Sequence, residues 1–100
     1  MFGLFKNKKK ETIQKYLKEG AQLLDVRTAS EFNGGHIEGS KNIPVQVIDQ
    51  QMNALDKEKP LIVYCAMGGR SNIAAGKLKA NGYKVVNAGG IGSMRKYLKS

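Results

Sequence analysis

The sequence has very few of the residues that build metal sites and disulfides. In 100 residues it contains one cysteine, Cys65, and one histidine, His36. A single cysteine cannot form an intrachain disulfide, and a four-ligand zinc site needs thiolates or imidazoles that the chain does not have. We therefore expect no metal and no cofactor, so the reactivity of the thiol depends on its local surroundings.

Long apolar runs are also missing. No stretch reaches the roughly 18 consecutive apolar residues that a membrane-spanning helix requires. The first residues place Phe2, Leu4 and Phe5 before the lysines, which reverses the order found in a signal peptide. These features predict a soluble, cytoplasmic protein that does not bind a membrane.

Acidic residues are outnumbered by basic ones, 8 against 17, which gives a net charge of +9. Four of the lysines fall close together near the start, at Lys6, Lys8, Lys9 and Lys10. We predict that residues 1–10 form a mobile basic arm and that residues 11–100 form one domain. A cationic domain favours small anionic ligands or an acidic partner protein. No basic stripe interleaved with aromatic residues indicates specific nucleic-acid binding.

Hydrophobic periodicity predicts alternating strands and helices. Helices are expected at residues 11–19, 47–55, 71–80 and 92–98, with a short one after the capping box of Thr28 and Glu31. Strands are expected at residues 22–26, 42–44, 61–64 and 84–87. Ser71 and Ser93 are candidate N-caps, and residues 88–90 are predicted to form a tight loop. The alternation predicts a three-layer α/β fold, with helices on both faces of a mostly parallel sheet.

Residues 65–70 follow the most apolar strand, residues 61–64, and precede the helix expected from Ser71. In open parallel sheets, ligands bind beyond the carboxyl ends of the strands, so this position favours a site. Gly68 and Gly69 permit backbone angles that other residues avoid, which lets successive N–H groups form a concave cradle beside a helix N-terminus. The segment is therefore predicted to bind an anion.

Cys65 is the candidate nucleophile of this segment. A free cysteine is only about 3% thiolate at pH 7, and lowering its pKa by about 2 units, or about 2.7 kcal/mol, makes the thiolate dominant. The loop amides, the helix N-terminus and the planar donors of Arg70 are groups that can do this. The alternative is a buried structural cysteine, which the two glycines and the arginine disfavour because they have no evident packing purpose.

Three segments, which together span nearly all of residues 12–98, resemble the rhodanese family of sulfurtransferases. They are residues 25–27 (Asp-Val-Arg) with Glu31, Phe32, 35–39 (Gly-His-Ile-Glu-Gly) and 42–44 (Asn-Ile-Pro); 63–65 (Val-Tyr-Cys) with Gly68, Arg70 and Ser71; and Gly82, Tyr83, Val85, Gly89 and Gly90. The resemblance implies a rhodanese-like fold and a two-step reaction. In it, the cysteine takes a sulfane sulfur from a donor such as thiosulfate and passes it, as a persulfide, to cyanide or a thiol.

The resemblance also implies roles for individual residues. Cys65 is the nucleophile and the persulfide carrier, and Arg70 orients the anionic donor. The substrate-binding residues, whose amides hold the negative charge of the outer sulfur, are Ala66, Met67, Gly68, Gly69, Arg70 and Ser71. Met67 stands where the family often has a polar residue, so it predicts a more apolar mouth of the site.

Four further residues are expected to support the site, namely Asp25, Arg27, Glu31 and His36. Asp25 is disfavoured as an acid or base because an ionised carboxylate beside the thiol would raise its pKa. Arg27 and Glu31 are expected to form a partly buried ion pair between the strand end and the short helix. For His36 the resemblance implies structural hydrogen bonding and not proton transfer.

Two other functions compete with sulfur transfer. A cysteine phosphatase also uses a thiolate, an anion-binding loop and an arginine, but its C-x5-R pattern encloses five residues, whereas Cys65 and Arg70 enclose four. The wider ring suits three phosphate oxygens, so the shorter loop favours sulfur. A non-catalytic sulfur carrier or partner-binding module would keep the same cysteine, and the sequence leaves this alternative open.

Overall fold

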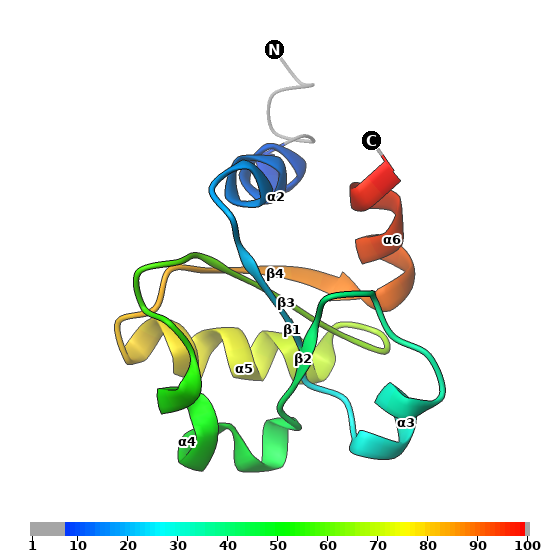
Figure 1. The fold of residues 1–100 in the computed structure, drawn as a ribbon, viewed down its shortest axis with the longest axis vertical. Helices are drawn as coiled ribbons and strands as arrows, with labels where there is room; N and C mark the ends of the chain where they lie inside the picture. Colours follow the sequence, from blue (N-terminus) through cyan, green and yellow to red (C-terminus); the bar gives the residue numbers. More distant parts are fainter. Residues whose placement is uncertain (1–7, 100) are drawn as a thin grey trace.

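The fold is built on a four-stranded sheet in which every pairing is parallel (Figure 1). The computed structural model describes residues 8–99. The strands, in the order β2-β1-β3-β4 across the sheet, are β1 (Gln22–Asp25), β2 (Lys41–Asn42), β3 (Leu61–Cys65) and β4 (Val85–Gly90). The structure thus confirms the α/β fold that the sequence predicts.

The inner strand β3 carries the candidate nucleophile to the edge of the sheet. All five of its residues are buried, because the strand is covered on both faces, and this explains its continuous apolar sequence. Tyr64 pairs with Asp25 of β1, and Cys65 pairs with Gly90 of β4. Since the carboxyl ends of parallel strands share one edge, the ends of β1 and β4 lie on either side of the end of β3.

Helices form a layer on each side of the sheet (Figure 1). On one side lie α2 (Lys8–Lys18) and α6 (Ile91–Lys99), and on the other lie α4 (Ile48–Gln51) and α5 (Gly69–Ala80). The short helix α3 (Ala29–Asn33) follows β1 and begins with the expected capping box of Thr28 and Glu31. Within residues 8–99, no helix is long and apolar enough to cross a membrane.

Two hydrophobic clusters fill the space between the layers. Side chains along β3 alternate between the faces. Leu61, Val63 and Cys65 therefore join the cluster under α4 and α5, while Ile62 and Tyr64 join the one under α2 and α6. The thiol of Cys65 consequently lies on the side of the sheet that α5 covers.

Two helices in the N-terminal half differ from the expected ones. α2 begins at Lys8, so residues 8–10 are helical and do not belong to an arm, while the rest of the expected arm, residues 1–7, lies outside the described residues. The helix expected at residues 47–55 is the four-residue α4 between two 3-10 turns, η1 (Val45–Val47) and η2 (Met52–Ala54). Gln51, with φ −114° and ψ −7°, is the last residue of α4, and the chain continues from it directly into η2.

The two later helices begin earlier than expected. α5 starts at Gly69 with Gly68 as its N-cap, so Ser71 lies inside the first turn and is not the cap. α6 starts at Ile91, so Ser93 is likewise inside its helix. α6 begins early because β4 continues through residues 88–90, which were expected to form a loop, and passes directly into this helix.

The end of β4 packs closely against the loop that follows Cys65. A Cβ atom added to Gly90 would lie 2.6 Å from the carbonyl oxygen of Ala66 and 3.3 Å from the Cα atom of Met67. Both are backbone atoms, which cannot move aside as a flexible side chain can. Glycine at position 90 is therefore needed for the loop to lie against the sheet.

Replacing Gly90 by alanine should lower the free energy of unfolding by about 1–3 kcal/mol, the usual cost of overpacking. Urea denaturation measures this. Gly92→Ala is the matched control, because an added Cβ there meets nothing within 4 Å and alanine favours a helix. Equal stabilities of the two variants would contradict the role assigned to Gly90.

Candidate active site

The side chain of Cys65 is surrounded by hydrogen-bond donors. It is 1% exposed, and the chain after it turns through residues 66–68 into α5. The Sγ atom accepts hydrogen bonds from the N–H of Gly68 at 2.9 Å and from the N–H of Ser71 at 3.4 Å. The loop and the first turn of α5 thus direct their amides at the sulfur.

Gly68 makes this turn of the chain possible. Its φ is 110°, in the region that side chains disfavour, and an added Cβ would lie 3.6 Å from the Cα atom of Gly89. Gly69 does not have a positive φ, because it is already the first residue of α5. The expectation of unusual backbone angles at both glycines is therefore correct only for Gly68.

The hydroxyl of Ser71 is a further hydrogen-bond partner of the sulfur, beyond the amide that the sequence predicts. Its Oγ lies 3.4 Å from Sγ of Cys65, 3.1 Å from the carbonyl oxygen of Gly68 and 3.4 Å from that of Gly89. A neutral thiol donates to Oγ while the hydroxyl donates to a carbonyl. When the thiol ionises, the hydroxyl can donate to the sulfur instead.

These donors change the acidity of the thiol. Burial has the largest single effect on the pKa of Cys65 and raises it, but the hydroxyl of Ser71 and the amides of Ser71, Gly68 and Met67 lower it by more. The net result is a pKa below the usual value. The N-terminus of α5 adds partial positive charge in the same direction. The site therefore favours the nucleophilic thiolate.

A buried ion pair lies where β1 ends, beside the strand that carries Cys65. Nη2 of Arg27 donates to Oδ2 of Asp25 at 2.7 Å, and Nε lies 3.0 Å from both carboxylate oxygens. Asp25 is completely buried, and it also accepts from the backbone N–H of Arg27 at 2.9 Å. The second bond of Nη2, to the carbonyl oxygen of Gly35 at 2.7 Å, joins the end of β1 to the loop before β2.

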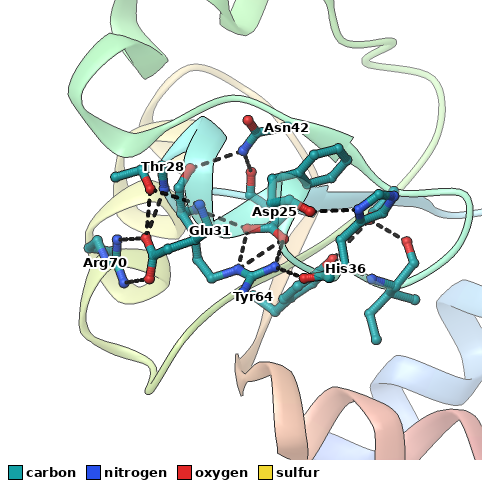
Figure 2. Close-up of polar contacts among 12 residues, drawn as sticks. Asp25, Thr28, Glu31, His36, Asn42, Tyr64 and Arg70 are labelled. Carbon is teal, nitrogen blue, oxygen red and sulfur yellow. Dashed lines mark hydrogen bonds and ion pairs between the residues drawn. The ribbon is translucent and has the colours of Figure 1, made fainter.

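The expected ion pair between Arg27 and Glu31 is wrong, because Glu31 binds Arg70 instead. Figure 2 shows the two side chains facing each other, with Nη1 of Arg70 donating to Oε1 at 2.7 Å and Nη2 to Oε2 at 3.0 Å. Arg27 is already occupied by Asp25. Arg70, at the start of α5, reaches Glu31 of α3 from 39 residues away along the chain.

This pairing changes the electrostatics around the loop. The hydrogen bond from Arg70 is the largest influence on Glu31 and, with the backbone of Thr28, lowers its pKa to about 2. The hydrogen bond to Glu31 is in turn the main reason that the pKa of Arg70 is raised, and the charge of Cys65 adds to it. Arg70 is thus within electrostatic reach of the sulfur, but both its terminal nitrogens contact Glu31.

Comparison with known proteins identifies the domain that contains this site. The model of the rhodanese-like domain matches residues 9–95. This protein belongs to the rhodanese-like family. The match includes β1 through β4 and the whole loop around Cys65.

Three relatives illustrate the range of the family. The chain is 47% identical over 62 residues to the uncharacterized protein YqhL of Bacillus subtilis, covering 62% of this chain and 49% of that protein, so it spans about half the length of that relative. It is 33% identical over 76 residues to the thiosulfate sulfurtransferase GlpE of Pseudomonas aeruginosa, covering 76% and 69%. A rhodanese-related protein of Thermoplasma volcanium has a TM-score of 0.73 and 28% identity, covering 90% and 87%.

The side chains of two other expected site residues of this rhodanese-like domain, His36 and Met67, are exposed. His36 is exposed; its Nδ1 lies 2.8 Å from the carbonyl oxygen of Phe32, and the two rings stack with centroids 3.7 Å apart (Figure 2). Met67 is 93% exposed and lies on the surface of the loop. Within residues 8–99, no group of three or more His, Cys, Asp and Glu side chains could hold a metal ion.

Replacing Ser71 by alanine should raise the pKa of Cys65, because the hydroxyl donor is lost while the burial of the sulfur remains. The pH dependence of alkylation by iodoacetamide measures this pKa, and its midpoint should move to higher pH. Asn72→Ala, an exposed neighbour on the same helix, should leave the midpoint in place. An unchanged midpoint in Ser71→Ala would mean that the amides alone set the acidity.

Replacing Glu31 by glutamine should weaken the dependence of stability on acid pH. The pKa of Glu31 is lowered from 4.5 to about 2 on folding, so its contribution is complete above pH 4.5 and is lost as the pH falls towards 2. Glutamine can still complete the capping box with Thr28. Thermal unfolding between pH 5 and pH 2 should therefore show a smaller loss in Glu31→Gln than in wild type or in the control Glu38→Gln. Parallel curves for all three would contradict the pairing with Arg70.

Proposed function

We propose that this rhodanese-like domain transfers sulfane sulfur through a persulfide on Cys65. The observation that carries the proposal is the convergence of the Ser71 hydroxyl and amide and the Gly68 amide on the buried Sγ atom. These donors favour a thiolate at the open edge of a parallel sheet, and a thiolate is a strong nucleophile towards sulfur. Similarity to a thiosulfate sulfurtransferase supports the same reaction.

The first step loads the sulfur. The thiolate of Cys65 attacks the outer sulfur of an anionic donor such as thiosulfate and forms a new S–S bond. The S–S bond of the donor breaks, and its electron pair leaves with sulfite. Cys65 now carries a persulfide whose outer sulfur is negatively charged.

The second step unloads it. A nucleophilic acceptor, either cyanide or a thiolate, attacks the outer sulfur of the persulfide. The S–S bond to Cys65 breaks, and its electron pair restores the thiolate. Because the chain has no second cysteine, the acceptor must be external. A reducing compartment keeps the thiol of Cys65 free and supplies thiol acceptors for the persulfide, so we place this cycle in the cytoplasm.

The loop amides are suited to hold the persulfide. The first amides of an α-helix have no acceptor within the helix, and in α5 these belong to Gly69, Arg70 and Ser71. Together with the amides of residues 66–68 they would hold the charge on the outer sulfur, as the donors of an oxyanion hole do. Arg70 attracts the anionic donor by its charge, although its terminal nitrogens contact Glu31.

Intact-mass measurement after incubation with thiosulfate tests the proposal. The wild-type protein should gain the mass of one sulfur atom, and Cys65→Ser should gain nothing. Added cyanide should then remove the sulfur as thiocyanate over repeated turnovers. Absence of a sulfur adduct on the wild-type protein would contradict the proposal.

Two other outcomes would assign the competing functions. A sulfur adduct without steady-state transfer to cyanide would make the protein a sulfur carrier and not a catalyst. Hydrolysis of aryl phosphates that is lost in Cys65→Ser would make it a phosphatase. Either result would replace the proposed sulfurtransferase function.

A further inference from the structure

The positive charge of the protein is concentrated in one helical layer. α2 and α6 together carry eight lysines and arginines and one acidic residue, a net charge of +7. The other described residues carry eight basic and seven acidic side chains, a net charge of +1. Because α2 and α6 lie on the same face of the sheet and contact each other, nearly all the excess charge is on one surface (Figure 1).

This charged layer contains a groove of about 330 Å³ between the two helices. It is lined by Gln14, Leu17, Lys18, Tyr97 and Leu98. Leu17 and Tyr97 pack against the hydrophobic cluster beneath, whereas Leu98 is 41% exposed. The groove therefore offers a partly apolar floor within a strongly basic surface.

The helical repeat places basic residues at the border of this floor. Residues three or four apart share a face of a helix, so Lys10 lies one turn from Gln14 and Arg95 lies one turn from Leu98. Lys18 lines the groove itself. The same repeat places one acidic residue, Glu11, one turn from Gln14. An occupant of the groove would thus meet an apolar floor, three cationic neighbours and one acidic one.

We propose that the groove binds an acidic, amphipathic segment of a partner protein. An apolar side chain of the segment would pack against Leu17 and Leu98, and its carboxylates would face Lys10, Lys18 and Arg95. A concave apolar floor accepts a protruding apolar side chain, which neither a flat bilayer surface nor the phosphate backbone of a nucleic-acid duplex supplies. The charge and the shape together therefore favour a protein segment.

The groove and the loop after Cys65 are connected by α6, although the thiol itself lies on the other side of the sheet. α6 begins directly after Gly90, which packs against the loop, and the rise from Gly90 to Leu98 is about 12 Å along a helix. A partner that continues from the groove along α6 and past Gly90 would reach the loop and present a sulfur donor or acceptor there. This last step rests on the proposed function, whereas binding in the groove does not.

Binding of a labelled synthetic peptide tests the groove directly. The probe has leucines at i, i+3, i+4 and i+7 and glutamates at the other positions, and the control is a scrambled peptide of the same composition. Fluorescence anisotropy at physiological ionic strength should show tighter binding of the amphipathic peptide. Lys18→Glu and Leu98→Gln should each weaken it about fivefold or more, because they remove a charge contact or part of the floor.

A matched variant separates the groove from general attraction by charge. Lys79→Glu makes the same change in net charge on α5, on the opposite side of the sheet, and should bind the peptide as wild type does. Equal affinity for both peptides, or equal weakening by Lys79→Glu and Lys18→Glu, would overturn the proposal. The proposal would also be overturned if phosphatidylglycerol vesicles or duplex DNA bound more tightly than the amphipathic peptide and only the groove variants lost this binding.

The same variants distinguish this proposal from the proposed function. Lys18 and Leu98 do not touch the loop, so both groove variants should still gain one sulfur atom from thiosulfate. Loss of peptide binding with normal sulfur loading supports the groove. A protein that binds the peptide but takes up no sulfur would refute the sulfur chemistry and leave the groove standing.

Discussion

The sulfur of Cys65 is buried, and a buried thiolate is stable only where hydrogen-bond donors replace the water that it has lost. The hydroxyl and amide of Ser71 and the amide of Gly68 are such donors. The rest of the fold places them: β3 brings the sulfur to the edge of the sheet, Gly68 turns the chain back around it, and Gly90 leaves room for the loop. The reactivity of this rhodanese-like site therefore depends on backbone geometry more than on any charged side chain.

The two ion pairs near the loop support this arrangement. They are not the main source of positive electrostatic potential at the sulfur. Asp25 and Arg27 fix the end of β1, and Glu31 joins the capping box of α3 to the first turn of α5 through Arg70. Because the guanidinium is paired with Glu31, it adds less positive potential than a free arginine would, and the amides and the dipole of α5 are the nearest sources of positive potential. The lysines of α2 and α6 add a broader field that attracts anions from farther away.

Local patterns in the sequence were sufficient for the order of the elements and for the position of Cys65. The capping box of Thr28 and Glu31 was predictable because its two residues are three apart. The partner of Arg70 was not, because Glu31 is 39 residues away and only the fold brings them together. Ser71 has the residue type of an N-cap, yet the helix begins earlier because Gly68 adopts a backbone angle that no local pattern specifies.

The pKa of the single thiol tests the central claim most directly. The ultraviolet absorption of the thiolate can be titrated in folded and in urea-unfolded protein, with Cys65→Ser as the blank for tyrosine. Since Cys65 is the only cysteine, the difference signal reports one group. The structure predicts a lower midpoint in the folded protein than in the unfolded chain. A folded midpoint equal to or above the unfolded one would show that burial outweighs the loop donors and would contradict this account of the site.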